Sequence, residues 1–191
     1  MLENDKIILR EISSNDTQNI LRWRNSEEVK KYFCMQEDLT KESHEWWLEN
    51  KVKTGEVIQY IIYDKEHDVD LGTVYIRNID KVDCNGEFGI YIGEPSYRNS
   101  GIGKSAMKLI CDYAFQTLKL HKIYLRVLES NERAISVYLK NDFQKEGVFK
   151  EHVYHPQRGF QNLVFMGKLN PTDDFSEEKT EEKCKVLRKT L

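Results

Sequence analysis

The most informative stretch of the sequence is Arg98-Asn-Ser-Gly-Ile-Gly-Lys-Ser105, which joins a run of strand-forming residues to an amphipathic helix. Two glycines one residue apart let the backbone turn sharply and leave its N–H groups unobstructed. The helix that follows places the positive end of its dipole behind those donors. The stretch therefore predicts a site for a phosphate or pyrophosphate, although any strand-to-helix turn also favours glycine.

The residues on either side of this loop indicate an α/β fold. From 103 onward, apolar residues recur at helical spacing along one face: Met107, Ile110, Cys111, Ala114, Phe115 and Leu118. Strands are expected at 7–12, 59–63, 71–79, 87–92, 122–127 and 163–166. Further helices are expected after 14–16, at 40–48 and at 132–140. The order, mostly β and then β-α-β-α-β, predicts a sandwich around a mixed sheet.

Composition limits the class of protein. The 191 residues fit one domain over 1–170, followed by a charged tail over 171–191 that is disordered or a solvated helix. A net charge of -3 gives no reason to expect nucleic-acid binding. No signal peptide or membrane span is expected, so a cytoplasmic location follows. The scattered cysteines predict no metal site, and His152 and His155 are interpreted as surface groups.

Two other phosphate loops compete for this stretch. A nucleotide triphosphate loop requires glycine where this chain has Arg98, so that pattern fails. A dinucleotide fingerprint matches Gly101, Gly103 and Ala106, and Glu129 ends the following strand where a ribose-binding acid would lie. That fingerprint begins directly after its strand, whereas 93–98 intervenes here. The dinucleotide interpretation stays open as a minor alternative.

A third type fits better. Arg98-x-x-Gly101-x-Gly103, followed after a strand by a block from Asn131 to Tyr138, resembles the GNAT acetyltransferase superfamily over roughly residues 5–168. The resemblance implies a single-domain, mixed and splayed β-sheet flanked by helices. It also implies acetyl-CoA as the acyl donor and direct attack of a deprotonated amine on the thioester. Dimers are common in this superfamily, so a homodimer is a candidate assembly.

The resemblance carries roles to particular residues. The backbone of Ile90, Tyr91 and Ile92 would bind the pantetheine arm, with Asn131 as a further contact. Tyr138 would protonate the leaving thiolate as general acid. Core packing for Tyr138 and helix capping for Asn131 are the competing explanations. The pyrophosphate would lie on Arg98, Asn99, Ser100, Gly101, Ile102, Gly103 and Lys104.

A base is also needed, because an alkyl ammonium titrates near about 10.4. Glu87 is the candidate, directly or through water, since it opens the strand that leads into the cofactor cleft. Partial burial there is expected to raise its pKa. An exposed strand-end glutamate is the equally weighted alternative.

The resemblance implies that the acceptor is a primary amine of a small molecule. Leu21-Arg-Trp-Arg-Asn25, 40–46 and 86–90 resemble the branch that acetylates nucleotide-linked amino sugars of the pseudaminic-acid pathway. Ribosomal-protein and polyamine acetyltransferases share a looser version, and a non-catalytic CoA-binding regulatory module is the alternative of another class. Arginines would hold a phosphate and tryptophans would stack on a base or sugar, although core burial competes for the tryptophans. The candidate acceptor residues are Arg22, Trp23, Arg24, Asn25, His44, Trp47 and Tyr154.

Overall fold

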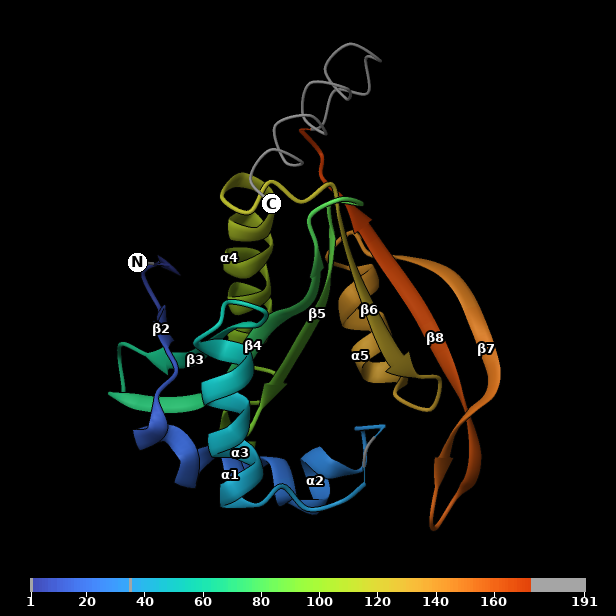
Figure 1. Cartoon of the computed structure of the whole chain (residues 1–191), viewed down its shortest axis with the longest axis horizontal. Helices are drawn as coiled ribbons and strands as arrows, with labels where there is room; N and C mark the ends of the chain where they lie inside the picture. Colours follow the sequence, from blue (N-terminus) through green and yellow to red (C-terminus); the bar gives the residue numbers. More distant parts are fainter. Residues whose placement is uncertain (1, 35, 173–191) are drawn as a thin grey trace.

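A mixed sheet runs through the computed structural model, which describes residues 2–34 and 36–172. Its order is β1-β2-β3-β4-β5-β6-β8-β7 (Figure 1). The strands are β1 (Leu2–Glu3), β2 (Ile7–Glu11), β3 (Ile58–Asp64), β4 (Val69–Asp80), β5 (Asn85–Ile92), β6 (Lys122–Leu128), β7 (Gln144–His155) and β8 (Gly159–Leu169).

Helices flank both faces of this sheet (Figure 1). They are α1 (Thr17–Asn25), α2 (Glu27–Lys30), α3 (Lys41–Trp47), α4 (Ile102–Gln116) and α5 (Glu132–Leu139). Short 3-10 turns cover Ser14–Asp16 and Pro95–Tyr97, and a π-helical turn covers Leu48–Val52. The large hydrophobic core lies between α4, α5 and the sheet, and a smaller one lies under α1 and α3.

Two helices form as their sequences predict. The apolar face of α4 is buried from Ile102 to Phe115, whereas Leu118, after the helix ends, is only partly buried. Thr40 caps α3 by accepting a hydrogen bond from the Ser43 backbone N–H at 3.2 Å. The predicted mixed sheet with flanking helices is confirmed.

β5 and β6 lie parallel, while the other paired strands of the described chain are antiparallel. Their register holds only from Asn85 to Glu87 on β5 and from Lys122 to Tyr124 on β6. Beyond these pairs the two strands diverge into a V (Figure 1). The α4 helix, which connects β5 to β6, packs against β4 and β5 on one side of this V.

The β7 strand is absent from the sequence prediction. It is an edge strand rich in charge, with register shifts at Lys145/Gly147 and Phe149/Val153. Its last residue, His155, is 5% exposed, so the prediction of a surface histidine is wrong. The turn after β7 folds back toward His155, where the backbone N–H of Gln157 donates to the ring Nδ1 and that of Arg158 donates to the carbonyl.

The predicted charged tail lies outside the described residues, apart from Pro171 and Thr172. The domain boundary at 170 therefore stays a prediction. Within the described ranges, no helix combines the length and the apolar character needed to cross a membrane.

Candidate functional site

The V between β5 and β6 leaves one side of a strand open. From Phe88 to Ile92, β5 pairs with β4 but has no register partner on β6 within the described chain. The predicted cofactor contacts at 90–92 therefore lie on an edge whose backbone groups face the opening. The side chains of Ile90 and Ile92 pack into the main core, and Tyr91 packs on the opposite face.

Tyr138 lies at the root of the V. Its ring meets Phe88 edge-on with centroids 6.2 Å apart, and Phe88 is the first residue beyond the last parallel pair. Phe143 lies 5.9 Å from the same ring. Burial, with a smaller contribution from Tyr75, raises the pKa of Tyr138. The phenol therefore keeps its proton at neutral pH.

Glu87 is buried on the other face of β5, where three side chains donate to its carboxylate. Arg77 on β4 donates to Oε1 at 2.9 Å, and Asn78 donates to Oε2 at 2.8 Å. Arg126 on β6 donates to both oxygens at 3.0 Å. The carboxylate thus joins β4, β5 and β6 where the V begins.

The predicted rise in the pKa of Glu87 is wrong. Burial opposes the charge and would raise the pKa, but Arg77 and Arg126 outweigh it and hold the pKa below its usual value. Glu87 is 4% exposed, so the alternative of an exposed strand-end glutamate is also wrong. The sequence prediction considered burial and lacked the two arginines.

The predicted pyrophosphate loop has the required backbone shape. Gly101 precedes α4 with φ of 86°, a left-handed conformation that favours glycine. A Cβ added to Gly103 would lie 3.8 Å from Ile92, so the fold itself leaves room there. Lys104 is exposed beside it, whereas the Ile102 side chain is buried in the core.

Polar side chains hold this loop from both sides. Arg98 donates through Nε to the carbonyl of Ile92 at 3.2 Å and pairs with Glu28 on α2. Asn99 accepts from Arg133 of α5 at 2.6 Å. The Ser100 hydroxyl donates to the carbonyl of Tyr97 at 2.6 Å. The Arg98 side chain is therefore engaged with β5 and α2.

Asn131 begins α5, where its side chain accepts from the Ala134 N–H at 3.2 Å. The capping role considered for this residue is confirmed. A contact with the pantetheine arm stays a prediction.

The segment after α1 folds over the same face of the sheet as Glu87. Asn25 holds it by exchanging two hydrogen bonds with the backbone of Leu39, at 2.8 and 2.9 Å. Phe33 lies between Arg24 and Tyr91: the guanidinium is 3.8 Å from its ring centroid, and the Tyr91 ring is 5.6 Å away. Arg24 and Asn25 thus hold this segment in place, and their contact with an acceptor stays a prediction.

Other predicted acceptor residues lie elsewhere. Trp23 is 1% exposed and donates its indole N–H to Glu94 at 2.8 Å, so it belongs to the core. His44 is buried between α3 and α1, with Nδ1 3.1 Å from the Thr17 hydroxyl. The predictions of substrate stacking by Trp23 and of acceptor contact by His44 are therefore wrong, because both side chains fill the interior.

Three further candidates do not contact Glu87 or the side chains that donate to it. Arg22 is exposed and paired with Glu94. Trp47 donates to the side chain of Gln59 at 2.9 Å. Tyr154 is exposed on β7, with its ring against Phe160. Their acceptor roles stay predictions.

The sequence prediction missed Tyr75, Arg77 and Arg126. Tyr75 pairs with Gly89 across β4 and β5, and its ring lies where a Cβ of Gly89 would be. Alternation along β4 puts Tyr75 and Arg77 on one face, which could have been read once the pairing with β5 was known. Arg126 also stands out as a charge inside an apolar strand.

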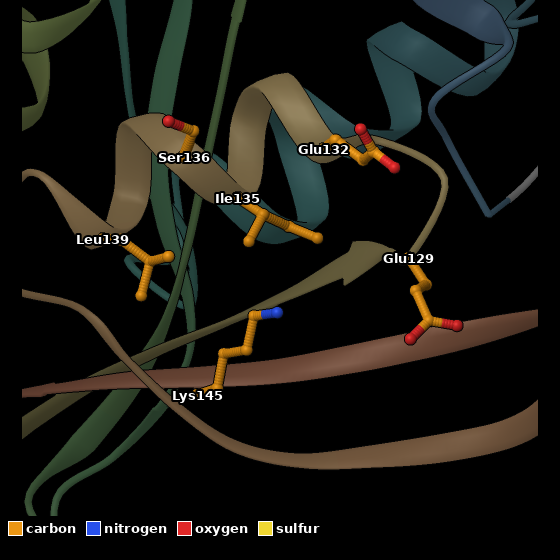
Figure 2. A pocket seen from close by; sticks show the side chains of 6 residues that line it. All are labelled: Glu129, Glu132, Ile135, Ser136, Leu139 and Lys145. Atoms are coloured by element: carbon orange, nitrogen blue, oxygen red, sulfur yellow. The ribbon is translucent and has the colours of Figure 1, made fainter.

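A cavity of about 510 Å³ lies between α5 and β7, away from this cluster (Figure 2). Ser136 and Leu139 on α5 line one wall and Lys145 lines the other. Tyr138 points to the opposite side of α5, toward Phe88. We therefore place the candidate site in the V. Among the described residues, no group of three or more His, Cys, Asp or Glu is arranged to hold a metal ion.

Parts of this sequence are similar to known proteins. A spermidine N(1)-acetyltransferase of Escherichia coli is 42% identical over 95 residues, half of each protein. The acetyltransferase PseH of Campylobacter jejuni is 26% identical over 133 residues, covering 70% of this chain and 80% of PseH. The chain spans half or less of the length of several relatives that it matches.

The fold matches a solved structure as well. Spermidine N-acetyltransferase from Vibrio cholerae, in complex with CoA and spermine, superposes with a TM-score of 0.81 at 23% identity. The match covers 87% of this chain and 97% of that one. The family model of the acetyltransferase (GNAT) domain matches residues 6–144, more than half of the chain. With its splayed strands and glycine loop, this chain belongs to the GNAT acetyltransferase family.

Proposed function

We propose that the protein acetylates a primary amine of a small molecule with acetyl-CoA as donor. The observation that carries this proposal is the position of Tyr138 at the root of the V, against Phe88. The free edge of β5 and the loop before α4 lead to the same point. A protonated phenol there is placed to meet the sulfur that leaves.

The chain offers a binding surface for the donor along this path. The N–H groups of the 98–104 loop and the dipole of α4 suit a pyrophosphate. Gly101 supplies the turn, and Gly103 leaves the backbone uncovered. The edge at 90–92 suits the amide groups of the pantetheine arm. Together these features favour CoA over a dinucleotide, whose loop begins directly after its strand.

In the proposed reaction the amine nitrogen attacks the thioester carbonyl and the C–S bond breaks. Tyr138 gives its proton to the departing sulfur. The amine proton leaves in the other direction, toward Glu87. Because its lowered pKa makes Glu87 a weak base, we propose that the ionised carboxylate orients a water molecule through which the amine proton passes to solvent.

Charge on the acceptor side supports an amine carried by an anionic molecule, such as a nucleotide-linked amino sugar. Arg77 and Arg126 both pair with the single carboxylate of Glu87. Two positive charges against one leave a net surplus of one, which attracts phosphate and repels a polycation. The similarity to PseH agrees with this choice.

A polyamine is the second candidate acceptor. The spermidine acetyltransferase of E. coli supports it, with 42% identity over half of this chain. A polyamine carries several positive charges, so its binding needs carboxylates that are not already paired. The pairing of Glu87 with two arginines weighs against this candidate.

Thiol release from acetyl-CoA tests the proposal. The panel contains UDP-amino sugars, dTDP-amino sugars, spermidine and short peptides with free N-termini, and mass spectrometry identifies the acetylated product. We expect release with the sugar nucleotides. Thiol release with spermidine alone would identify a polyamine, and not an amino sugar, as the acceptor. CoA binding without thiol release on any amine would favour a regulatory module.

A homodimer is also proposed, from the family resemblance. One V. cholerae spermidine N-acetyltransferase structure is described as dodecameric. Sedimentation velocity of the full chain would distinguish a monomer, a dimer and a larger assembly.

A further inference from the structure

A second cavity, of about 230 Å³, lies between α2 and the turn that joins β7 to β8. Its walls come from segments more than a hundred residues apart in the sequence, so the fold itself creates it. It is lined by Glu27, Lys30, Lys31, Gln36, His155, Pro156, Gln157 and Arg158.

The α2 helix separates this cavity from the cofactor loop. Glu27, Lys30 and Lys31 are spaced i, i+3 and i+4, so they share one face of the α2 turn. Glu28 points elsewhere, because its carboxylate pairs with Arg98 of the loop. A ligand in the cavity and a pyrophosphate on the loop would therefore occupy different sides of α2.

The lining of the cavity is electropositive. Lys30, Lys31 and Arg158 face one acidic group, Glu27, which leaves a surplus of two positive charges. Lys30 is 2.6 Å from Asp38, so that charge is partly neutralised. Lys31 and Arg158 form no ion pair with any residue that the structure describes. A concave surface with such a surplus favours an anion.

His155 also lines the cavity. The ring is buried, and its Nδ1 accepts the backbone N–H of Gln157 at 3.1 Å. In the neutral ring the proton is consequently on Nε2, which becomes a hydrogen-bond donor. Arginine, lysine and a histidine N–H together match the acceptor oxygens of a phosphate.

The cavity also adjoins the acceptor side. Gln36 lines it and donates to the carbonyls of Lys30 and Phe33. Phe33, in the same short segment, lies against Tyr91 of β5. One loop therefore contacts both the cavity and the face of the sheet that carries Glu87.

We propose that this cavity binds the phosphate of the acceptor, as in a nucleoside diphosphate that carries the reactive amino sugar. This inference rests on the proposed function and assigns the anionic part of the substrate to its own subsite. A volume of about 230 Å³ holds a diphosphate, whereas pockets for whole small molecules start near about 300 Å³. The sugar amine would extend from here toward the V.

Calorimetric titration of UDP tests this site, with CoA saturating so that the pyrophosphate loop is filled. The variants are Arg158→Gln and Lys31→Gln, and Lys150→Gln on β7 is the matched loss of one positive charge outside the cavity. We expect Kd to rise about tenfold in each cavity variant and to stay unchanged in the control. An unchanged CoA affinity shows that the variants are folded.

Failure takes distinct forms. Absent UDP binding, or equal binding by Arg158→Gln and the native chain, would overturn the subsite. Binding of inorganic phosphate at these residues without binding of UDP would identify a free phosphate and overturn the assignment to the acceptor.

The subsite and the acetyl transfer can also fail separately. The Arg158→Gln change is expected to raise KM for a UDP-amino sugar and not for the free amino sugar. UDP binding without thiol release on any amine would overturn the proposed function and leave the cavity site standing. Acetylation of the UDP-amino sugar with an unchanged KM in Arg158→Gln would overturn only the subsite.

Discussion

Arg126 on β6 donates three hydrogen bonds to the carboxylate of Glu87 on β5, at 3.0 to 3.1 Å. Glu87 belongs to the last register pair before the two strands part. The guanidinium therefore ties the strands together where the V opens, in a geometry that strengthens charged hydrogen bonds. It also keeps the carboxylate ionised.

Replacing Glu87 by Gln is expected to destabilise the fold by about 2 kcal/mol at pH 7, because Arg77 and Arg126 lose their shared anion. The pKa of Glu87 is lowered in the folded chain, so its stabilisation is present at neutral pH. It is lost as pH falls below the ordinary carboxyl value of about 4.3 and through the lowered folded pKa. Urea unfolding at several pH values measures this difference, with the exposed Glu66→Gln as control. If Glu87→Gln destabilised the fold equally at acidic and neutral pH, the predicted pH dependence would be contradicted.

The pH dependence of kcat/KM should follow the amine and not the enzyme. Tyr138 has a raised pKa and Glu87 a lowered one, so neither group titrates between about pH 6 and 9. When two acceptors differ in the pKa of their amine, the rising limb of the pH profile should shift by that same difference in pKa. A limb that stays fixed for all acceptors would reveal a titrating enzyme group.

Tyr138→Phe should lower kcat by about 10²–10⁴-fold, because the leaving thiolate loses its proton donor. CoA affinity should stay unchanged, since the ring and its contacts with Phe88 and Phe143 remain. Steady-state kinetics and CoA titration check both expectations. Tyr113→Phe on α4, whose ring lies against Tyr60, is the matched hydroxyl deletion. Equal activity in both variants would remove Tyr138 from the reaction.

Two glycine substitutions in the loop should have different effects on stability. Gly101→Ala places a side chain at φ of 86° and should cost about 1 kcal/mol of stability. Gly103→Ala lies in the first turn of α4, meets only Ile92 at 3.8 Å, and should leave stability unchanged or slightly higher. Its Cβ would cover the backbone that faces the pyrophosphate, so CoA affinity should fall at least about tenfold. Thermal melting and CoA titration separate these effects, and native affinity in Gly103→Ala would place the pyrophosphate elsewhere.

Local signals in the sequence predicted the parts of the fold that depend on neighbouring residues. The apolar period of α4, the Thr40 cap and the glycines of the loop each fix a short stretch by its own chemistry. The site needed more. Arg126 meets Glu87 only because a parallel pair brings residues 39 positions apart into contact.

Burial also reversed several predictions. Trp23, beside two arginines, has the composition of a binding motif, yet its ring fills the space over Gly93. β7 escaped prediction because the stretch from Gln144 to Glu151 has charges where an alternating strand would place apolar residues. The strand conformation of β7 therefore depends on its pairing with β8 and not on an alternating hydrophobic pattern of its own.

The charges and register shifts of β7 have a consequence for the behaviour of the protein in concentrated solution. An exposed sheet edge offers unpaired backbone groups to any neighbouring chain and is a common starting point for fibrils. Here Lys145, Lys150 and Glu151 stand along that edge, and two irregularities interrupt its line. The protein therefore has a long strand at its border that resists templated aggregation.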